Sequence, residues 1–323
     1  MSAGVFEAWL LAFLLWTGLA LGCLGLLMIG HLLKESWVHP LRDELEAGAR
    51  TVPLTALLAL PLLFGLSDLY PWARPGFADE SMLPPYRVQY LQPTWVLVRT
   101  GVFFIIWIAL ALWIARPGTH RRASALGLVL LAATVSLAAI DWIGSRQPEW
   151  WSSLFGMAFG VNQLLGALAL ASMVDLVRPG AIHLHRDQVR GLAKTLLALA
   201  LVALWLWFSQ FLIVWSANLP HEVQWYLVRQ NGWGLLNLGV IIPALVLAMA
   251  LLVPRDAGWP RMMIACGLLL LHHLAYMIWL IRPAAADPTL GWPDSLALVG
   301  VGLLWGGLFV YCLRPQPAVA EGR

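Results

Sequence analysis

Hydrophobic residues run along this chain in long, nearly unbroken blocks, and the short segments between the blocks hold most of the charge. A block of about twenty apolar residues is long enough to cross the roughly 30 Å of hydrocarbon in a bilayer as an α-helix. The pattern predicts nine such helices, over residues 8–33, 52–70, 95–115, 124–142, 152–177, 192–217, 234–253, 261–282 and 294–313. We therefore expect an all-α membrane protein with one polytopic domain over residues 1–323.

The composition agrees with a membrane location. Hydrophobic residues make up 60% of the chain, charged residues only 11%, and the mean hydropathy is +0.77. Soluble domains contain about twice that charged fraction. The net charge of +3 comes from the loops, so we read it as a signal of membrane topology and expect no nucleic-acid partner.

Basic residues favour one set of loops. Those after the odd-numbered helices, together with the C-terminal tail, hold 14 of the 20 Lys and Arg. The other six are Arg74, Arg87, Arg99, Arg146, Arg229 and Arg282. Because Lys and Arg are retained on the cytoplasmic side of a membrane, we expect an outside N-terminus and an inside C-terminus.

The order of the helices suggests an internal repeat, as in many membrane folds. A late Ser followed by a polar residue recurs about 140 residues apart, at Ser67-Asp68 and Ser209-Gln210. The copies would be residues 8–142 and 152–282. We expect two four-helix bundles side by side, with residues 294–313 as an extra helix.

Polar side chains inside the apolar blocks gather toward the expected outer ends. They are Asp68, Arg99, Asp141, Ser209, Gln210 and Asn218. Charge in hydrocarbon is costly, so such residues usually face a bundle interior, a water cavity or a partner subunit. Asp68, Arg99 and Asp141 lie at similar depth, which makes an ion pair of Arg99 with a carboxylate plausible. In one interpretation the pair holds the helices together. In the other, a carboxylate exchanges protons with a water-filled funnel on the outer side of the membrane.

Three uncharged polar residues have a simpler interpretation. Ser209, Gln210 and Asn218 are expected to hydrogen-bond across helices, or to satisfy backbone groups where a helix ends near Pro220.

Histidine and cysteine limit the redox chemistry. Only His272 and His273 lie near mid-membrane, and because they are adjacent on one helix we expect at most one to face the interior. That histidine would bond a neighbouring side chain, donate to a quinone oxygen or relay protons. His273 and Tyr276 share a helix face, and with Asp141 they are the candidates for quinone binding.

The cysteines are solitary and form no metal or haem attachment motif. They are Cys23, Cys266 and Cys312. We expect no metal and no cofactor bound by this chain, with quinone as the one ligand left open.

Two irregular stretches resemble a known family. Residues 141–156, DWIGSRQPEWWSSLFG, are similar to a D-W-x-x-S-x-x-P-x-W-x-S-x-x-F-G signature, and residues 208–222, FSQFLIVWSANLPHE, are similar to an F-S-Q-x-x-x-I-W-x-A-N-x-P-x-E run. Residues 69–73 and Arg99 resemble further positions of that family. It is the ActF family of membrane subunits of bacterial alternative complex III, a quinol:cytochrome c (or other acceptor) oxidoreductase. The chain departs from it at Tyr276, where the family pattern has a carboxylate.

The resemblance implies a multi-pass subunit of the bacterial inner (cytoplasmic) membrane, related to the polysulfide-reductase membrane-subunit fold. It would be a cofactor-free scaffold in lipid, beside other membrane subunits and beneath periplasmic haem and iron–sulfur subunits. The expected docking residues are Trp142, Glu149, Trp150, Trp215, His221 and Glu222. The expected proton path would use Asp68, Arg99, Asp141 and His273.

Two other functions stay open. One is a membrane subunit that binds quinone in its own right. The other is an autonomous ion or solute transporter, which should have a midplane site with broken helices. As a scaffold or as a quinone-binding subunit, the chain would be part of an oxidoreductase. As a scaffold it would have no catalytic residues of its own.

Overall fold

Helices make up the architecture of this chain. The computed structural model describes residues 3–33, 39–116, 121–178, 186–254 and 258–313, and this part contains no strand. Nine helical segments in it are long and apolar enough to cross a membrane, which confirms the predicted fold class. Seven are single helices: α1 (Ala3–Leu32), α7 (Pro93–Ile114), α8 (Arg121–Trp142), α9 (Phe155–Val177), α10 (Arg186–Ala217), α14 (Trp259–Ile281) and α15 (Trp292–Leu313).

Proline interrupts the other two segments. The second consists of α2 (Arg42–Arg50), α3 (Val52–Ala59), the 3-10 turns of η1 (Leu60–Gly65) and α4 (Leu66–Leu69). The seventh consists of α12 (Gly232–Leu236), the π-turn η4 (Asn237–Ile241) and α13 (Ile242–Leu252). Pro61 lies in η1, and Pro243 is the second residue of α13. A proline has no N–H to donate and its ring clashes with the preceding turn, so the α-helical ladder breaks at both places.

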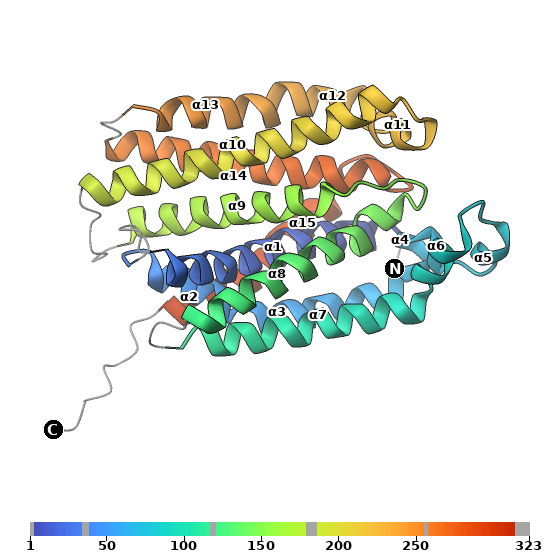
Figure 1. The fold of residues 1–323 in the computed structure, drawn as a ribbon, viewed down its shortest axis with the longest axis horizontal. Helices are drawn as coiled ribbons and strands as arrows, with labels where there is room; N and C mark the ends of the chain where they lie inside the picture. Colours follow the sequence, from blue (N-terminus) through green and yellow to red (C-terminus); the bar gives the residue numbers. More distant parts are fainter. Residues whose placement is uncertain (1–2, 34–38, 117–120, 179–185, 255–257, 314–323) are drawn as a thin grey trace.

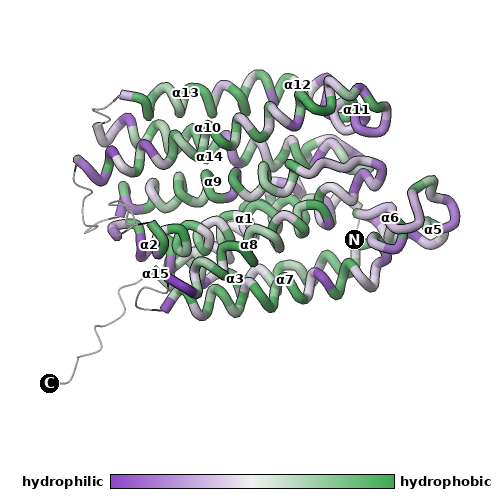
Figure 2. Tube along the Cα trace, in the orientation of Figure 1, coloured by the Kyte–Doolittle hydropathy of each residue, from purple (hydrophilic) through white to green (hydrophobic). Residues whose placement is uncertain are grey.

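Short helices connect the long ones at one end of the bundle. They are η2 (Pro71–Ala73), α5 (Phe77–Glu80), α6 (Pro85–Tyr90), η3 (Gly144–Arg146), α11 (Pro220–Leu227) and η5 (Arg282–Ala284). We call this the Asp141 end; the N-terminus of α1 also lies there, and α5 and α6 project beyond the bundle (Figure 1). Hydrophobic residues fill the middle of the molecule, and hydrophilic ones mark both ends (Figure 2).

Helix α1 lies at the centre of the molecule. Its most apolar window is 94% buried, whereas that of α15 is only 17% buried. It packs against α2, α8, α9 and α15. A helix that is apolar all round is suited to such a position. Close approach to α9 requires Gly22, where a Cβ would lie 2.4 Å from the carbonyl oxygen of Gln163.

The helix contacts bear on the predicted grouping. Helices α1, α3, α7 and α8 contact one another in turn, as do α9, α10, α13 and α14, and α15 packs on α1 and α2. Because α1 also packs closely on α9, the two groups share an interface. The internal repeat and the orientation in the membrane stay predictions.

Candidate functional site

The first buried charge pair at the Asp141 end joins α7 to α8. Arg99 donates from Nε to Oδ2 of Asp141 at 2.9 Å and from Nη2 to Oδ1 at 3.1 Å. Asp141 is fully buried, whereas the Arg99 side chain is 21% exposed. Two parallel charge-assisted bonds of this kind fix both direction and distance. The predicted pairing of Arg99 with a carboxylate is confirmed.

Tyr90 completes this pair. Its hydroxyl donates to Oδ1 of Asp141 at 2.8 Å, its carbonyl oxygen accepts two bonds from Arg99, and its ring lies 3.9 Å from the guanidinium carbon. Pro85 starts α6 and Pro93 starts α7, so the turn between them presents Tyr90 to α8. Burial raises the pKa of the Tyr90 hydroxyl above its usual range, and the neighbouring Asp141 carboxylate raises it further.

Asp68 lies apart from this group. Its side chain is exposed, and within the described ranges it has no ion pair. The chain unwinds through η1 just before it, which alters the depth and direction expected from an unbroken helix. Of the three charges expected together, the structure brings together Arg99 and Asp141.

A second ion pair was not anticipated from the sequence. Arg146, in η3, donates from Nη2 to both carboxylate oxygens of Glu7 at 2.6 Å. The two side chains are 1% and 5% exposed. Glu7 lies in the second turn of α1, where a lone acid before an apolar run is unremarkable in sequence. The pair attaches the central helix to the segment that follows α8.

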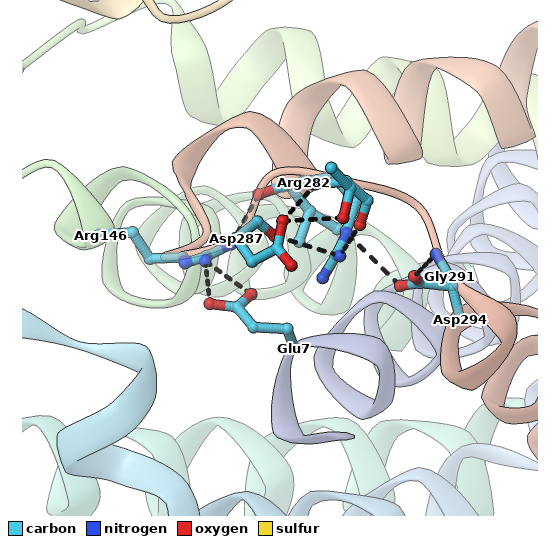
Figure 3. Close-up of polar contacts among 8 residues, drawn as sticks. Glu7, Arg146, Arg282, Asp287, Gly291 and Asp294 are labelled. Carbon is cyan, nitrogen blue, oxygen red and sulfur yellow. Dashed lines mark hydrogen bonds and ion pairs between the residues drawn. The ribbon is translucent and has the colours of Figure 1, made fainter. Parts of the chain in front are cut away.

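Arg282 and Asp294 continue this network toward α15 (Figure 3). Arg282 Nε lies 3.5 Å from Oδ1 of Asp294, and both side chains are 5% exposed. Arg282 also donates from Nη2 to the carbonyl oxygens of Asp287 and Thr289, and Asp294 accepts from the backbone N–H of Gly291 at 2.9 Å. The turn between α14 and α15 is therefore closed by polar contacts.

Two arginines reach the C-terminal end of α14. Arg146 donates to the carbonyl oxygen of Ile281 at 2.7 Å, and Arg229 donates to that of Leu280 at 2.8 Å. The last carbonyls of a helix lack partners within the helix and carry partial negative charge, so cations there are stabilising. Positive side chains thus cap this helix from two different loops.

Arg229 is buried without a carboxylate partner in the described residues. Its guanidinium carbon lies 3.4 Å from the ring centroid of Trp225, and it also donates to Oε1 of Gln147 and to the carbonyl oxygen of Trp225. Burial lowers the pKa of Arg229 well below its usual value, and the nearby Arg146 charge lowers it further. The indole face and the α14 terminus are what stabilise this cation.

The tryptophans of residues 141–156 divide into buried and exposed ones. Trp142 is buried, donates to Thr100 and packs on Phe104; Trp150 is buried and stacks on Trp225 with ring centroids 3.9 Å apart. The prediction that Trp142 and Trp150 dock a partner is therefore wrong for their side chains in this fold. Their large aromatic area is already covered by the chain itself.

The other expected docking residues are at the surface. Glu149 and His221 are exposed, Glu222 is half-buried, and Trp215 is 68% exposed. These four side chains remain available to a partner.

Ser145 ties residues 141–156 to the segment that follows the second span. It donates to the carbonyl oxygen of Asp141 and accepts from Nε1 of Trp72 at 2.8 Å. Tyr70 donates to the carbonyl oxygen of Trp142 at 3.1 Å. Residues 69–73 therefore pack directly on residues 141–156.

The three uncharged polar residues have different surroundings. Gln210 is buried, accepts from Ser152 Oγ at 3.4 Å and donates to the Tyr226 hydroxyl at 3.5 Å. Asn218 is exposed, has a φ of 48°, and its backbone N–H donates to Val214, so it ends α10 as a left-handed cap. Ser209 is half-buried, and no side-chain hydrogen bond is found for it in the described part of the chain.

Asn162, His272 and His273 form a hydrogen-bonded group deeper in the membrane-spanning region, which we call the relay. Asn162 Nδ2 is 3.2 Å from His272 Nε2, and Asn162 Oδ1 is 2.8 Å from His273 Nδ1. His272 Nδ1 is 2.9 Å from the carbonyl oxygen of Ile241, an acceptor, so this nitrogen carries the hydrogen. Both histidines are 2% exposed. The expectation that only one faces the interior is wrong, because neighbouring helices cover both directions.

The expected pairing of His273 with Tyr276 differs in the structure. The ring that stacks on Tyr276 is His272, with centroids 6.1 Å apart. The Nε2 atom of His273 is buried without a hydrogen-bond partner in the described residues.

A cavity of about 400 Å³ opens beside Tyr90. It is bounded by α6, the end of α8 and the segment that leads into α9, and its walls include Arg87, Trp150 and Phe155. Among the described residues, no group of three or more His, Cys, Asp or Glu could hold a metal ion.

Comparison with known proteins leaves the family resemblance as a hypothesis. No family model matches this chain, and no curated protein is significantly similar to it.

Proposed function

We propose that this chain is an integral membrane subunit of a quinol-oxidising respiratory complex, similar in role to the ActF subunit of alternative complex III. It binds no redox cofactor itself. It scaffolds the membrane arm in the bacterial inner membrane, and its Asp141 end receives periplasmic haem and iron–sulfur subunits.

One observation carries this proposal. The two stretches that resemble the family are far apart in sequence but adjacent in the fold, joined by the contact of Ser152 with Gln210. Asp141 and Ser145 of the first stretch are buried and hydrogen-bonded, and Trp150 is buried and stacked on Trp225. These buried side chains hold the two stretches together at one end of the bundle. A scaffold that docks other subunits needs such a rigid end.

The surface of that end favours a protein partner. Tyr86 is 71% exposed and Met82 is 99% exposed, both in the projecting segment that contains α5 and α6 (Figure 1). Trp151 is 48% exposed, and its ring lies 5.1 Å from the Arg87 guanidinium carbon of α6. Exposed aromatic and Met side chains are enriched where proteins associate. They lie in connecting segments rather than along the membrane-spanning helices.

The proposal includes a proton path through Asp68, Arg99, Asp141 and His273. No hydrogen bond among the described residues connects the Arg99–Asp141 pair with the Asn162–His273 relay. A path would need water between them.

Purification from native membranes in a mild detergent tests the proposal. We expect haem- and iron–sulfur-containing subunits to co-purify with the tagged chain, with visible haem absorption in the fraction. A variant of the exposed Arg74, such as Arg74→Gln, should retain the complex, because the one side-chain hydrogen bond found for Arg74 among the described residues is to the carbonyl oxygen of Ser67 in the same segment. Isolation of the chain alone, without other subunits from intact membranes, would contradict the role.

A further inference from the structure

The cavity beside Tyr90 combines two chemical environments. Ile140, in the membrane-spanning α8, and Phe155 form part of its apolar wall. Tyr86 and Arg87, in the connecting segment, form its polar edge. A pocket that passes from the hydrocarbon level to the interface suits an amphipathic molecule, and the lipid bilayer supplies such molecules at high concentration.

The charge of this pocket is positive. Arg87 is half-buried and has no carboxylate within ion-pair distance among the described residues. The carboxylate of Asp141 lies behind Tyr90 and is already paired with Arg99. A negatively charged headgroup therefore meets one uncompensated cation and no free acid in this wall.

Contacts within the chain also fix the position of the Arg87 side chain. It donates from Nη1 to the carbonyl oxygen of Glu149 at 3.2 Å and from Nη2 to that of Trp150 at 3.1 Å, and it lies 5.1 Å from the ring of Trp151. These bonds occupy two of its five N–H donors. The remaining donors suit phosphate oxygens, which arginine binds through parallel hydrogen bonds.

We propose that this cavity binds an anionic phospholipid, with the phosphate at Arg87 and an acyl chain along Ile140 and Phe155. The recognised group is a headgroup of net negative charge, bound through its phosphate and lacking a cation of its own, and the apolar wall requires that it be attached to a hydrocarbon chain. The site does not depend on the respiratory role proposed above, so either proposal can fail without the other.

Native mass spectrometry of the full-length, delipidated protein tests this inference. Phosphatidylglycerol and phosphatidylcholine with identical acyl chains are added in parallel, and inorganic phosphate is a third addition followed by thermal unfolding. We expect one phosphatidylglycerol to be retained more tightly than phosphatidylcholine, and no stabilisation by phosphate alone. Equal retention of the two lipids, stabilisation by phosphate alone, or an isoprenoid quinone in place of the lipid would overturn the proposal.

Substitutions then locate the site. Arg87→Gln should weaken phosphatidylglycerol binding about tenfold, the loss expected for a charge-assisted contact. Arg87→Lys should retain most of the binding because the charge remains. Arg74→Gln, at an exposed arginine of the same end, should bind as the unmodified chain does. Unchanged binding in Arg87→Gln would contradict the assignment.

A second variant guards against a folding defect, because Arg87 also ties α6 to residues 149–150. Ile140→Trp fills the apolar wall and leaves the Arg87 contacts in place. We expect it to displace the lipid, and undiminished binding would overturn the proposed position of the acyl chain.

Discussion

Glu7 and Arg146 form a bidentate ion pair that joins positions 139 residues apart in the sequence, with both N–O distances at 2.6 Å. Arg146 also donates to the carbonyl oxygen of Ile281, the last residue of α14. One guanidinium therefore fixes the start of the central helix, the segment after α8 and the end of α14. Because a buried charge needs a partner, this arrangement makes the Asp141 end sensitive to the loss of either member.

Glu7→Gln should destabilise the protein by roughly 3–5 kcal/mol, because Arg146 is left buried without its carboxylate. The double variant Glu7→Leu, Arg146→Met should be more stable than Glu7→Gln, since it removes both charges. Thermal unfolding in detergent measures both. The matched control is Glu46→Gln, which removes two partly exposed i,i+4 pairs, with Arg42 and with Arg50, and should cost about 1 kcal/mol or less. Equal effects of Glu7→Gln and Glu46→Gln would contradict the structural role of the buried pair.

Substitutions around Asp141 should differ in severity. Arg99→Met leaves a buried carboxylate without a cation and should cost roughly 3–5 kcal/mol. Tyr90→Phe removes one hydrogen bond to a charged group and should cost about 1.5–3 kcal/mol. Asp68→Asn, at the exposed acid, should change stability by about 0.5 kcal/mol or less. The ranking, measured as shifts in unfolding temperature, fails if Asp68→Asn is as damaging as Arg99→Met.

The sequence allowed an ion pair of Arg99 with Asp68 or Asp141 to be expected, because all three residues interrupt long apolar helices at similar depth; which carboxylate forms the pair came from the structure. The sequence contains no comparable signal for Arg146, Arg229 and Arg282, which follow helix ends and look like ordinary loop arginines. In the fold these segments turn back over the bundle, so that their side chains reach the carbonyls and carboxylates beneath. Contacts made across such distances depend on tertiary packing, which hydropathy does not record.

The histidines show a similar limit. Adjacent helical residues point about 100° apart, so the sequence favoured one interior histidine. His272 reaches Ile241 of η4 and His273 reaches Asn162 of α9, since α14 has neighbours on both sides. The number of helices and their apolar character could be predicted from the length of the hydrophobic blocks. Which helices would lie next to one another could not.

Asn162→Leu should destabilise the packing among α9, α10, α13 and α14. Asn162 is the common partner of His272 and His273, and its loss leaves two imidazole nitrogens in an apolar interior, each costing about 1–3 kcal/mol. Gln89→Leu, at an exposed amide of α6, is the control and should have little effect. An unfolding temperature of Asn162→Leu equal to that of the control would mean that the relay contributes nothing to stability.

A single water molecule should bridge Thr17 and Gln163. The two side chains line a small cavity of about 20 Å³, and Thr17 Oγ1 and Gln163 Oε1 have no hydrogen-bond partner in the described residues. That volume and two polar walls meet the requirement for one buried water. An experimental density map of high resolution should contain an ordered peak there, and Thr17→Val should remove it. An empty cavity in the unmodified protein would contradict this prediction.

Site-specific photocrosslinking in native membranes tests the central claim most directly, because it reports which end of the bundle contacts redox partners. A photoreactive residue at Met82, at the Asp141 end, is compared with one at Val253, which follows α13 at the opposite end; both side chains are exposed. We predict that haem- or iron–sulfur-containing subunits are crosslinked from Met82 and not from Val253. Crosslinks to those subunits from Val253 alone would contradict the account.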